Sequence, residues 1–107
     1  AYANHIAKVL SSALQNNSNL EVLSLTDSNL SATGASSLAE GIAGNSTLRR
    51  LNLDRNCIGD VGMVALGQAI KKSSLRSLSV SQNSITDQSM NFKSVSQLEE
   101  LHLNGNL

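Results

Sequence analysis

Few side chains in this 107-residue chain are suited to chemistry. Its two histidines, His5 and His102, and its single cysteine, Cys57, lie far apart in the sequence. No metal-ligand spacing surrounds His5, and we expect it to be an exposed surface residue on the first helix. Cys57 has no histidine nearby to act as its base, so we interpret it as a small packing residue or a free thiol. His102 lies two residues after Glu100, and a pH-sensitive contact there is a minor alternative.

Phosphate binding by a glycine-rich loop is also not indicated. The segment Gly59-Asp-Val-Gly62 has neither the spacing nor the lysine of a phosphate-binding loop. Its glycines fit turns and close helix packing better. We therefore expect no catalytic residue, no cofactor and no metal site.

Charge and composition exclude several classes of partner. Eight basic and eight acidic residues give a net charge of +0 and a pI near 7.0, so no overall field attracts nucleic acid or an anionic membrane. A single cysteine cannot form an internal disulfide, and no apolar run approaches the ~20 residues of a membrane span. The lone thiol and the lack of a signal sequence indicate a cytoplasmic location.

An internal repeat determines how the remaining residues are positioned. Three segments fit Leu-x-x-Leu-x-Leu-x-x-Asn-x-Leu, except that Ser28 replaces the first asparagine, and a fourth segment fits up to its last position. The repeats are 28, 27 and 23 residues long. The four segments begin at Leu20, Leu48, Leu75 and Leu98.

The intervals between these segments carry a helical pattern. Apolar or small residues recur at i, i+4, i+7 and i+8, which predicts one buried stripe on each helix. The third interval has room for only about two helical turns, and we expect Met90, Phe92 and Val95 to fill the space that a longer helix would occupy. The three stripes are Ile6, Leu10, Ala13 and Leu14; Gly34, Leu38, Gly41 and Ile42; and Gly62, Leu66, Ala69 and Ile70.

This pattern resembles the leucine-rich repeat family over essentially the whole chain. The long period with a full helix is similar to the ribonuclease-inhibitor subclass, which is also found in NOD-like receptors and Ran GTPase-activating proteins. The resemblance implies a buried ladder of asparagines at Asn56, Asn83 and Asn106, with Ser28 or Asn29 as a weaker first rung.

Alternation along a strand separates a buried face from an exposed one. Leu51 and Leu53 share one face, whereas Arg50, Asn52 and Asp54 share the other. Strands pack ~4.8 Å apart but helices need ~8–10 Å, so the stack bends with its strands on the inner side. We expect small residues such as Ala13, Gly41 and Ala69 to ease helix crowding.

The predicted fold is therefore a right-handed α/β solenoid, with parallel strands on the concave face and helices on the convex face. The segment is expected to be a single domain and a fragment of a longer solenoid. Its units are 1–19 (partial), 20–47, 48–74, 75–97 and 98–107 (partial).

The polar side of the strands is the candidate binding surface. Four of the eight basic residues lie in or beside its middle, and acidic residues lie at both ends. Since arginine forks suit carboxylates, we expect a protein partner with an acidic protrusion. The candidate residues are Arg49, Arg50, Asn52, Asp54, Arg55, Arg76, Ser79, Glu100 and His102.

Two functions fit this surface. The first is a protein–protein interaction module or scaffold, since many members of the resembled family act as sensors, inhibitors or scaffolds, including cytoskeletal and ciliary ones. The alternative is a GTPase-activating protein resembling the Ran GTPase activators, with Arg55 as the residue that stabilises phosphoryl transfer.

Overall fold

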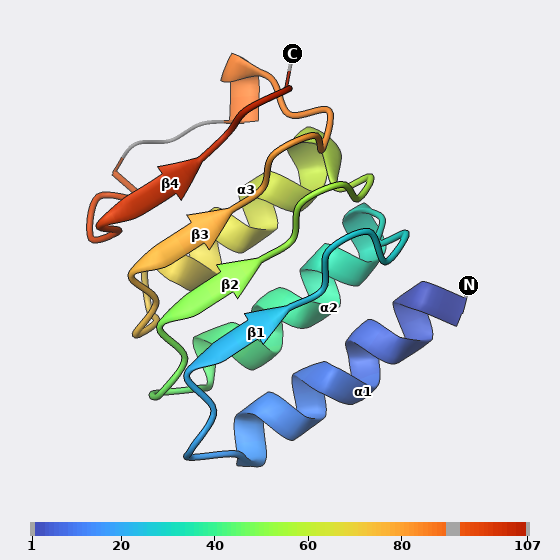
Figure 1. Ribbon diagram of the computed structural model, residues 1–107. Helices are drawn as coiled ribbons and strands as arrows, with labels where there is room; N and C mark the ends of the chain where they lie inside the picture. The colour runs from blue at the N-terminus through green and yellow to red at the C-terminus, as the bar shows by residue number, and fades with distance from the viewer. Residues whose placement is uncertain (1, 90–92, 107) are drawn as a thin grey trace.

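Each leucine-containing segment forms a short strand, and each long interval forms a helix (Figure 1). The structure is a computed structural model that describes residues 2–89 and 93–106. Its elements are α1 (Tyr2–Asn16), β1 (Val22–Ser24), α2 (Ala32–Ala43), β2 (Arg50–Asn52), α3 (Gly59–Ile70), β3 (Ser77–Ser79), the 3-10 helix η1 (Asp87–Ser89) and β4 (Glu100–His102).

The four strands form one parallel sheet in the order β1-β2-β3-β4. Equivalent positions of the repeat lie side by side, because Leu23, Leu51, Leu78 and Leu101 are in register. Successive strands are joined by crossovers on one side of the sheet, as a parallel sheet requires. The predicted α/β solenoid is thus confirmed.

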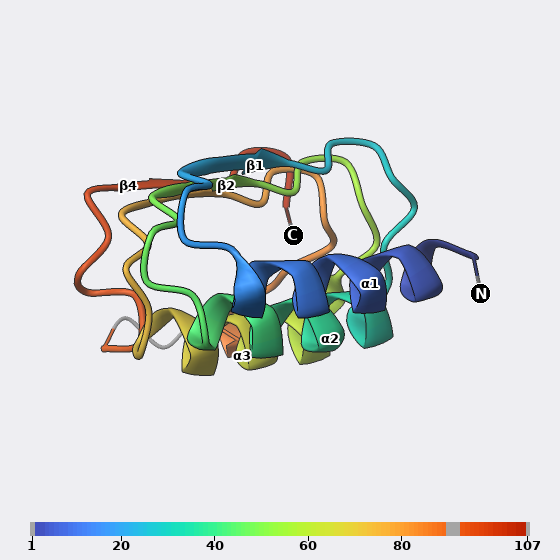
Figure 2. The ribbon, with the colours of Figure 1, turned by 90° about the horizontal axis from the view of Figure 1, so that it is seen from below.

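The molecule has two layers, with the sheet on one side and the helices on the other (Figure 2). The leucines of each strand point into the space between the layers and meet the apolar stripes of α2 and α3. Leu38, Leu66, Ile70 and Leu78 are all fully buried there. Each such side chain contributes roughly 1.5–3 kcal/mol on leaving water.

Small residues allow neighbouring helices to lie close together at the interfaces of α1 with α2 and of α2 with α3. A Cβ on Gly41 of α2 would lie 2.6 Å from the backbone oxygen of Ser11 in α1, and one on Gly62 of α3 would lie 3.2 Å from the Cβ of Ala35 in α2. The expectation for Ala13 was wrong: this residue is exposed, because no described helix packs on that side of α1.

The short third interval forms the single turn η1 and a series of turns in place of a full helix. Val95 is buried against the core, as its expected filling role requires. Met90 and Phe92 lie outside the described residues. Within the described part of the chain, no helix is long and apolar enough to cross a membrane.

The asparagine ladder is present at all three of its expected positions. The amide of Asn56 accepts hydrogen bonds from the N–H groups of Ser28 and Leu30 and donates to the carbonyl oxygen of Leu25, so it joins two repeats. Asn83 and Asn106 each bond the preceding repeat in a similar way. The first rung is altered, because the Ser28 hydroxyl donates only to Thr26 in its own turn.

A second set of polar side chains links the repeats at the other ends of the strands. Asn45 donates to the carbonyl oxygens of Leu14 and Asn17 in the preceding repeat and accepts from the N–H of Leu48. Thr47 and Ser74, which come just before the next leucine segment, likewise donate to the carbonyls of Leu20 and Leu48 at the start of the segment before it. The sequence pattern did not predict this linking role of Asn45.

Candidate functional site

The outward side of the sheet, here called the strand face, is a shallow hollow of about 470 Å³. Strand alternation turns every second side chain outward, and the parallel register lines these side chains up in rows. Most of them are polar, so they can face water without a partner. The strand face comprises Val22, Ser24, Arg50, Asn52, Asp54, Ser77, Ser79, Ser81, Glu100, His102 and Asn104.

Two of the predicted charged residues meet across the middle of the strand face. The guanidinium of Arg50 on β2 lies 3.6 Å from the carboxylate of Glu100 on β4, above the small Ser77 of β3. Both side chains are at least half exposed, so the pair contributes at most ~1 kcal/mol. The basic centre expected from the sequence is therefore partly neutralised by its acidic neighbour.

Asp54 has a structural task on the same surface. Its carboxylate accepts a hydrogen bond from the Ser79 hydroxyl at 2.6 Å and another from the Ser81 N–H at 2.8 Å. Asn52 in turn accepts from the Asp54 N–H. These bonds fix the floor of the hollow and leave fewer free groups there than the sequence indicated.

The other predicted arginines lie at the two rims. Arg49 and Arg76 precede β2 and β3, and their guanidinium groups donate to the carbonyls of Ser74 and Leu75. Arg55 lies at the opposite rim in the turn after β2, is exposed, and has a positive φ of 56°. The structure therefore separates Arg55 from the other arginines, whereas it brings Arg50, Glu100 and His102 onto one surface.

The histidines and the cysteine do not form a joint site. His5 is exposed on α1 and His102 is exposed on the strand face, while Cys57 is an exposed free thiol. Within residues 2–89 and 93–106, no three His, Cys, Asp or Glu side chains lie close enough to hold a metal ion.

The pKa of the Asp60 carboxylate is lowered by its hydrogen bonds. The hydroxyl of Thr86 donates to Asp60 at 2.5 Å, and this bond, followed by one from the Thr86 N–H at 2.7 Å, lowers the pKa of Asp60 below its usual value. A hydrogen bond from Ser89 lowers this pKa further, and burial opposes the effect. Asp60 thus links α3 to the next repeat.

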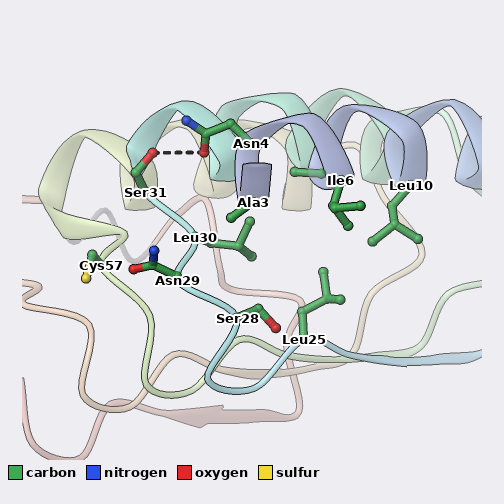
Figure 3. Close-up of a pocket in the computed structure, with 11 residues that line it drawn as sticks. Ala3, Asn4, Ile6, Leu10, Leu25, Ser28, Asn29, Leu30, Ser31 and Cys57 are labelled. Carbon is green, nitrogen blue, oxygen red and sulfur yellow. Dashed lines mark hydrogen bonds between the residues drawn. The ribbon is translucent and has the colours of Figure 1, made fainter. Parts of the chain in front are cut away.

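Sequence reasoning missed a second hollow, which lies beneath α1 and has a volume of about 600 Å³. Figure 3 shows Ile6 and Leu10 of α1 pointing toward Leu25 across this space. One polar contact spans its rim, where Ser31 donates to Asn4. Ile6, which lines this hollow, stands at a position where the next two repeats have glycine.

The chain is similar in sequence to known repeat proteins. A leucine-rich repeat family model matches residues 16–39, 44–67 and 71–90. A protein phosphatase 1 regulatory subunit 37 homolog of Caenorhabditis elegans is 38% identical over 88 residues, which cover 77% of this chain and 9% of that protein. The ribonuclease inhibitor of Sus scrofa is 45% identical over 47 residues, which cover 44% of this chain and 10% of the inhibitor. The chain thus matches about a tenth of the length of each of these relatives.

Two solved structures share the fold. The tropomodulin C-terminal domain of Caenorhabditis elegans superposes with a TM-score of 0.81 at 18% identity, covering 94% of this chain and 65% of that one. The actin-binding site 2 of leiomodin-1 gives a TM-score of 0.78 at 21% identity, covering 97% of this chain and 65% of that one. These likenesses establish the architecture.

Proposed function

The chain belongs to the leucine-rich repeat family, and we propose that it is a protein–protein interaction module that binds a partner protein through the strand face. The family fold supplies a rigid frame, so function depends on the side chains of the face rather than on the fold itself.

The observation that carries this proposal is the strand face itself, a shallow hollow lined by polar side chains. Hydrogen bonds from two sets of polar side chains, one at each end of the strands, hold the backbone beneath it. The strand face offers donors, acceptors and both signs of charge, and its main-chain positions are fixed by the asparagine and threonine bonds between repeats. A preorganised surface loses little conformational entropy when a partner binds.

The relatives support the same role. A phosphatase regulatory subunit and a ribonuclease inhibitor are named for acting on other proteins, and leiomodin-1 for binding actin. We propose that this segment likewise contributes a contact surface to a larger assembly. A cytoplasmic, cytoskeleton-associated location remains a prediction.

We expect the partner to present acidic side chains to Arg50 and Arg76. The acidic side chain that reaches Arg50 would compete with Glu100 for it. Because the Arg50–Glu100 contact is exposed and weak, a partner carboxylate can displace it at little cost. Before the partner binds, this contact holds Arg50 over the hollow.

Charge reversal tests this role. The purified chain is immobilised and titrated with protein phosphatase 1 catalytic subunit, pancreatic ribonuclease and monomeric actin, and differential capture from lysate extends the panel. We expect Arg50→Glu with Arg76→Glu to weaken binding of the partner at least about tenfold and to reduce its salt dependence.

Lys71→Glu with Lys72→Glu is the matched control, because it changes the net charge equally at exposed positions after α3. This control should alter affinity less than about twofold. Equal losses for both pairs would show that net charge, and not the strand face, governs binding. Unchanged affinity for the arginine pair would refute the proposed surface.

The GTPase-activator alternative rests only on Arg55, which is exposed at one rim of the strand face. Because most arginines of folded proteins are exposed, this position does not indicate a catalytic role. We therefore do not propose it as a second function. Unchanged GTP hydrolysis by a Ran-type GTPase on addition of the chain would dismiss it.

A further inference from the structure

All four strands begin at the same end of the sheet, and two arginines occupy neighbouring positions there (Figure 1). Arg49 and Arg76, here called the rim pair, directly precede β2 and β3, and the N–H of Arg76 donates to the carbonyl oxygen of Arg49 at 2.9 Å. Since paired strands lie ~4.8 Å apart, the register sets two positive side chains next to each other. Like charges at such positions repel, and a negative group between them relieves the repulsion.

Main-chain carbonyls hold both side chains of the rim pair in place. Nη1 of Arg49 donates to the carbonyl oxygen of Ser74, and Nη1 of Arg76 donates to that of Leu75, each at 3.0 Å. Because Ser74 and Leu75 are consecutive residues, the two guanidinium groups are anchored at adjacent points of one loop. A guanidinium has five N–H donors, so most donors of the rim pair remain for another partner.

Carboxylates flank the rim pair without neutralising it. Glu21 and Glu99 lie one strand further out on either side, each joined to the nearer arginine by a main-chain hydrogen bond. Within the described part of the chain, Arg50 forms an ion pair with Glu100, whereas neither member of the rim pair forms one. The rim pair therefore keeps two unneutralised arginine forks.

These forks suit a phosphate group better than a carboxylate. A carboxylate has two oxygens and fills one arginine fork. A phosphate monoester has three free oxygens and a charge of about −1.5 to −2 at pH 7, so it can occupy two forks at once. The site also opens onto the strand face, since the next residues along the chain, Arg50 and Ser77, line that hollow.

We propose that the rim pair binds a phosphorylated serine or threonine of the partner protein, whose chain continues across the strand face. This inference rests on the proposed function, because it names the acidic group that reaches Arg76. The phosphate lies between the two guanidinium groups and accepts hydrogen bonds from both. Recognition of the partner then depends on its state of phosphorylation.

Titration of the isotopically labelled 107-residue chain with a capped phosphoserine tests the site without any partner. The probe is added over about 0.1 to 20 mM, which suits the affinity of a single group, and nuclear magnetic resonance follows the Nε–Hε signals of the arginines. The signals of Arg49 and Arg76 should shift together with one dissociation constant, and that of Arg55 at the opposite rim should stay in place. A capped glutamate should bind at least about tenfold more weakly.

Single substitutions identify the two forks. Arg49→Gln and Arg76→Gln should each weaken phosphoserine binding at least about tenfold, since each removes the charge-assisted hydrogen bonds of one fork. Lys8→Gln is the matched control, because it removes the same charge from an exposed position on α1 and should change the affinity less than about twofold. Glu21→Gln combined with Glu99→Gln should strengthen binding about twofold or more, because it removes the flanking negative charges. Backbone amide spectra check that each variant folds.

Arginine signals of the rim pair that stay in place up to the highest concentration would overturn the proposal. Equal affinities for the phosphoserine and glutamate probes would overturn it as well, because the site would then be one for carboxylates. A folded Arg49→Gln or Arg76→Gln chain that binds the probe like the parent would show that two forks are not needed. If either variant fails to fold, the arginine signals of the parent still decide the question.

The partner itself separates this inference from the proposed function. A strand-face partner treated with a phosphatase should bind the parent chain at least about tenfold more weakly, and the treatment should matter much less for Arg49→Gln. Unchanged affinity after the treatment would overturn the phosphate site and leave the strand face standing. The role of the strand face is read from Arg50→Glu alone, which leaves the rim pair intact.

Discussion

At the scale of single residues, asparagine links one repeat to the next. Its amide carries two donors and an acceptor on a short side chain, so it can satisfy main-chain groups of two turns at once. Asn83 is completely buried and joins the backbone of Ile58 to that of Leu53. Serine at position 28 has a single donor and reaches only its own turn.

Asn83→Ala should lower the free energy of unfolding by roughly 2–3 kcal/mol, because it leaves buried main-chain groups without partners. Urea denaturation followed by circular dichroism measures this loss. Asn104→Ala is the control, since that side chain is exposed and should change stability by no more than about 0.5 kcal/mol. Equal effects of the two substitutions would contradict a structural ladder.

At the scale of elements, the spacing of the helices is set by glycine. A Cβ at position 41 would lie 2.7 Å from the Ser11 Cα, which is closer than side chains tolerate. A Cβ at Gly67 would meet only the Ser94 side chain, at 3.5 Å from its Cβ, which is an ordinary contact. The two glycines have equal helix propensity, so only packing distinguishes them.

Gly41→Ala should therefore destabilise the chain by about 1–3 kcal/mol, since separation of α1 from α2 outweighs the gain in helix propensity. Gly67→Ala should instead be neutral or stabilising by up to ~1 kcal/mol. Thermal and urea unfolding of both variants measures the difference. A stabilising Gly41→Ala would show that the two helices separate freely.

At the scale of the whole molecule, each repeat is stabilised by its neighbours. The helix α2 packs between α1 and α3, whereas α1 packs against α2 alone among the described helices. In such arrays stability is close to a sum over neighbouring pairs, so outer elements open more readily than inner ones.

Hydrogen exchange measured by mass spectrometry should show this gradient. Amides of α1 should exchange at least about tenfold faster than those of α2, because among the described helices α1 contacts α2 alone, and a hollow lies beneath it. Uniform exchange of the two helices would instead indicate a single cooperative unit.

The sequence pattern was enough to predict the strands, the α2 and α3 stripes and the parallel order, whereas the three asparagine rungs were implied by the resemblance to a known family. Leucines at period 2 and small or apolar residues at helical spacing must be buried, and a repeated pattern can bury them only by stacking. The sequence also placed the rows of the strand face, whose binding role stays a prediction.

The tertiary structure alone decided how those outward residues interact. The Arg50–Glu100 contact and the Asp54 bonds join residues 50 and 25–27 positions apart, and their distances depend on sheet geometry and side-chain rotamers. The exposure of Ala13 and the hollow beneath α1 follow from which elements have a neighbour in space. A periodic sequence specifies the repeating unit, because every unit must bury the same apolar positions. Exposed ion pairs, in contrast, contribute at most ~1 kcal/mol each, so a sequence pattern does not reveal which charged side chains will pair.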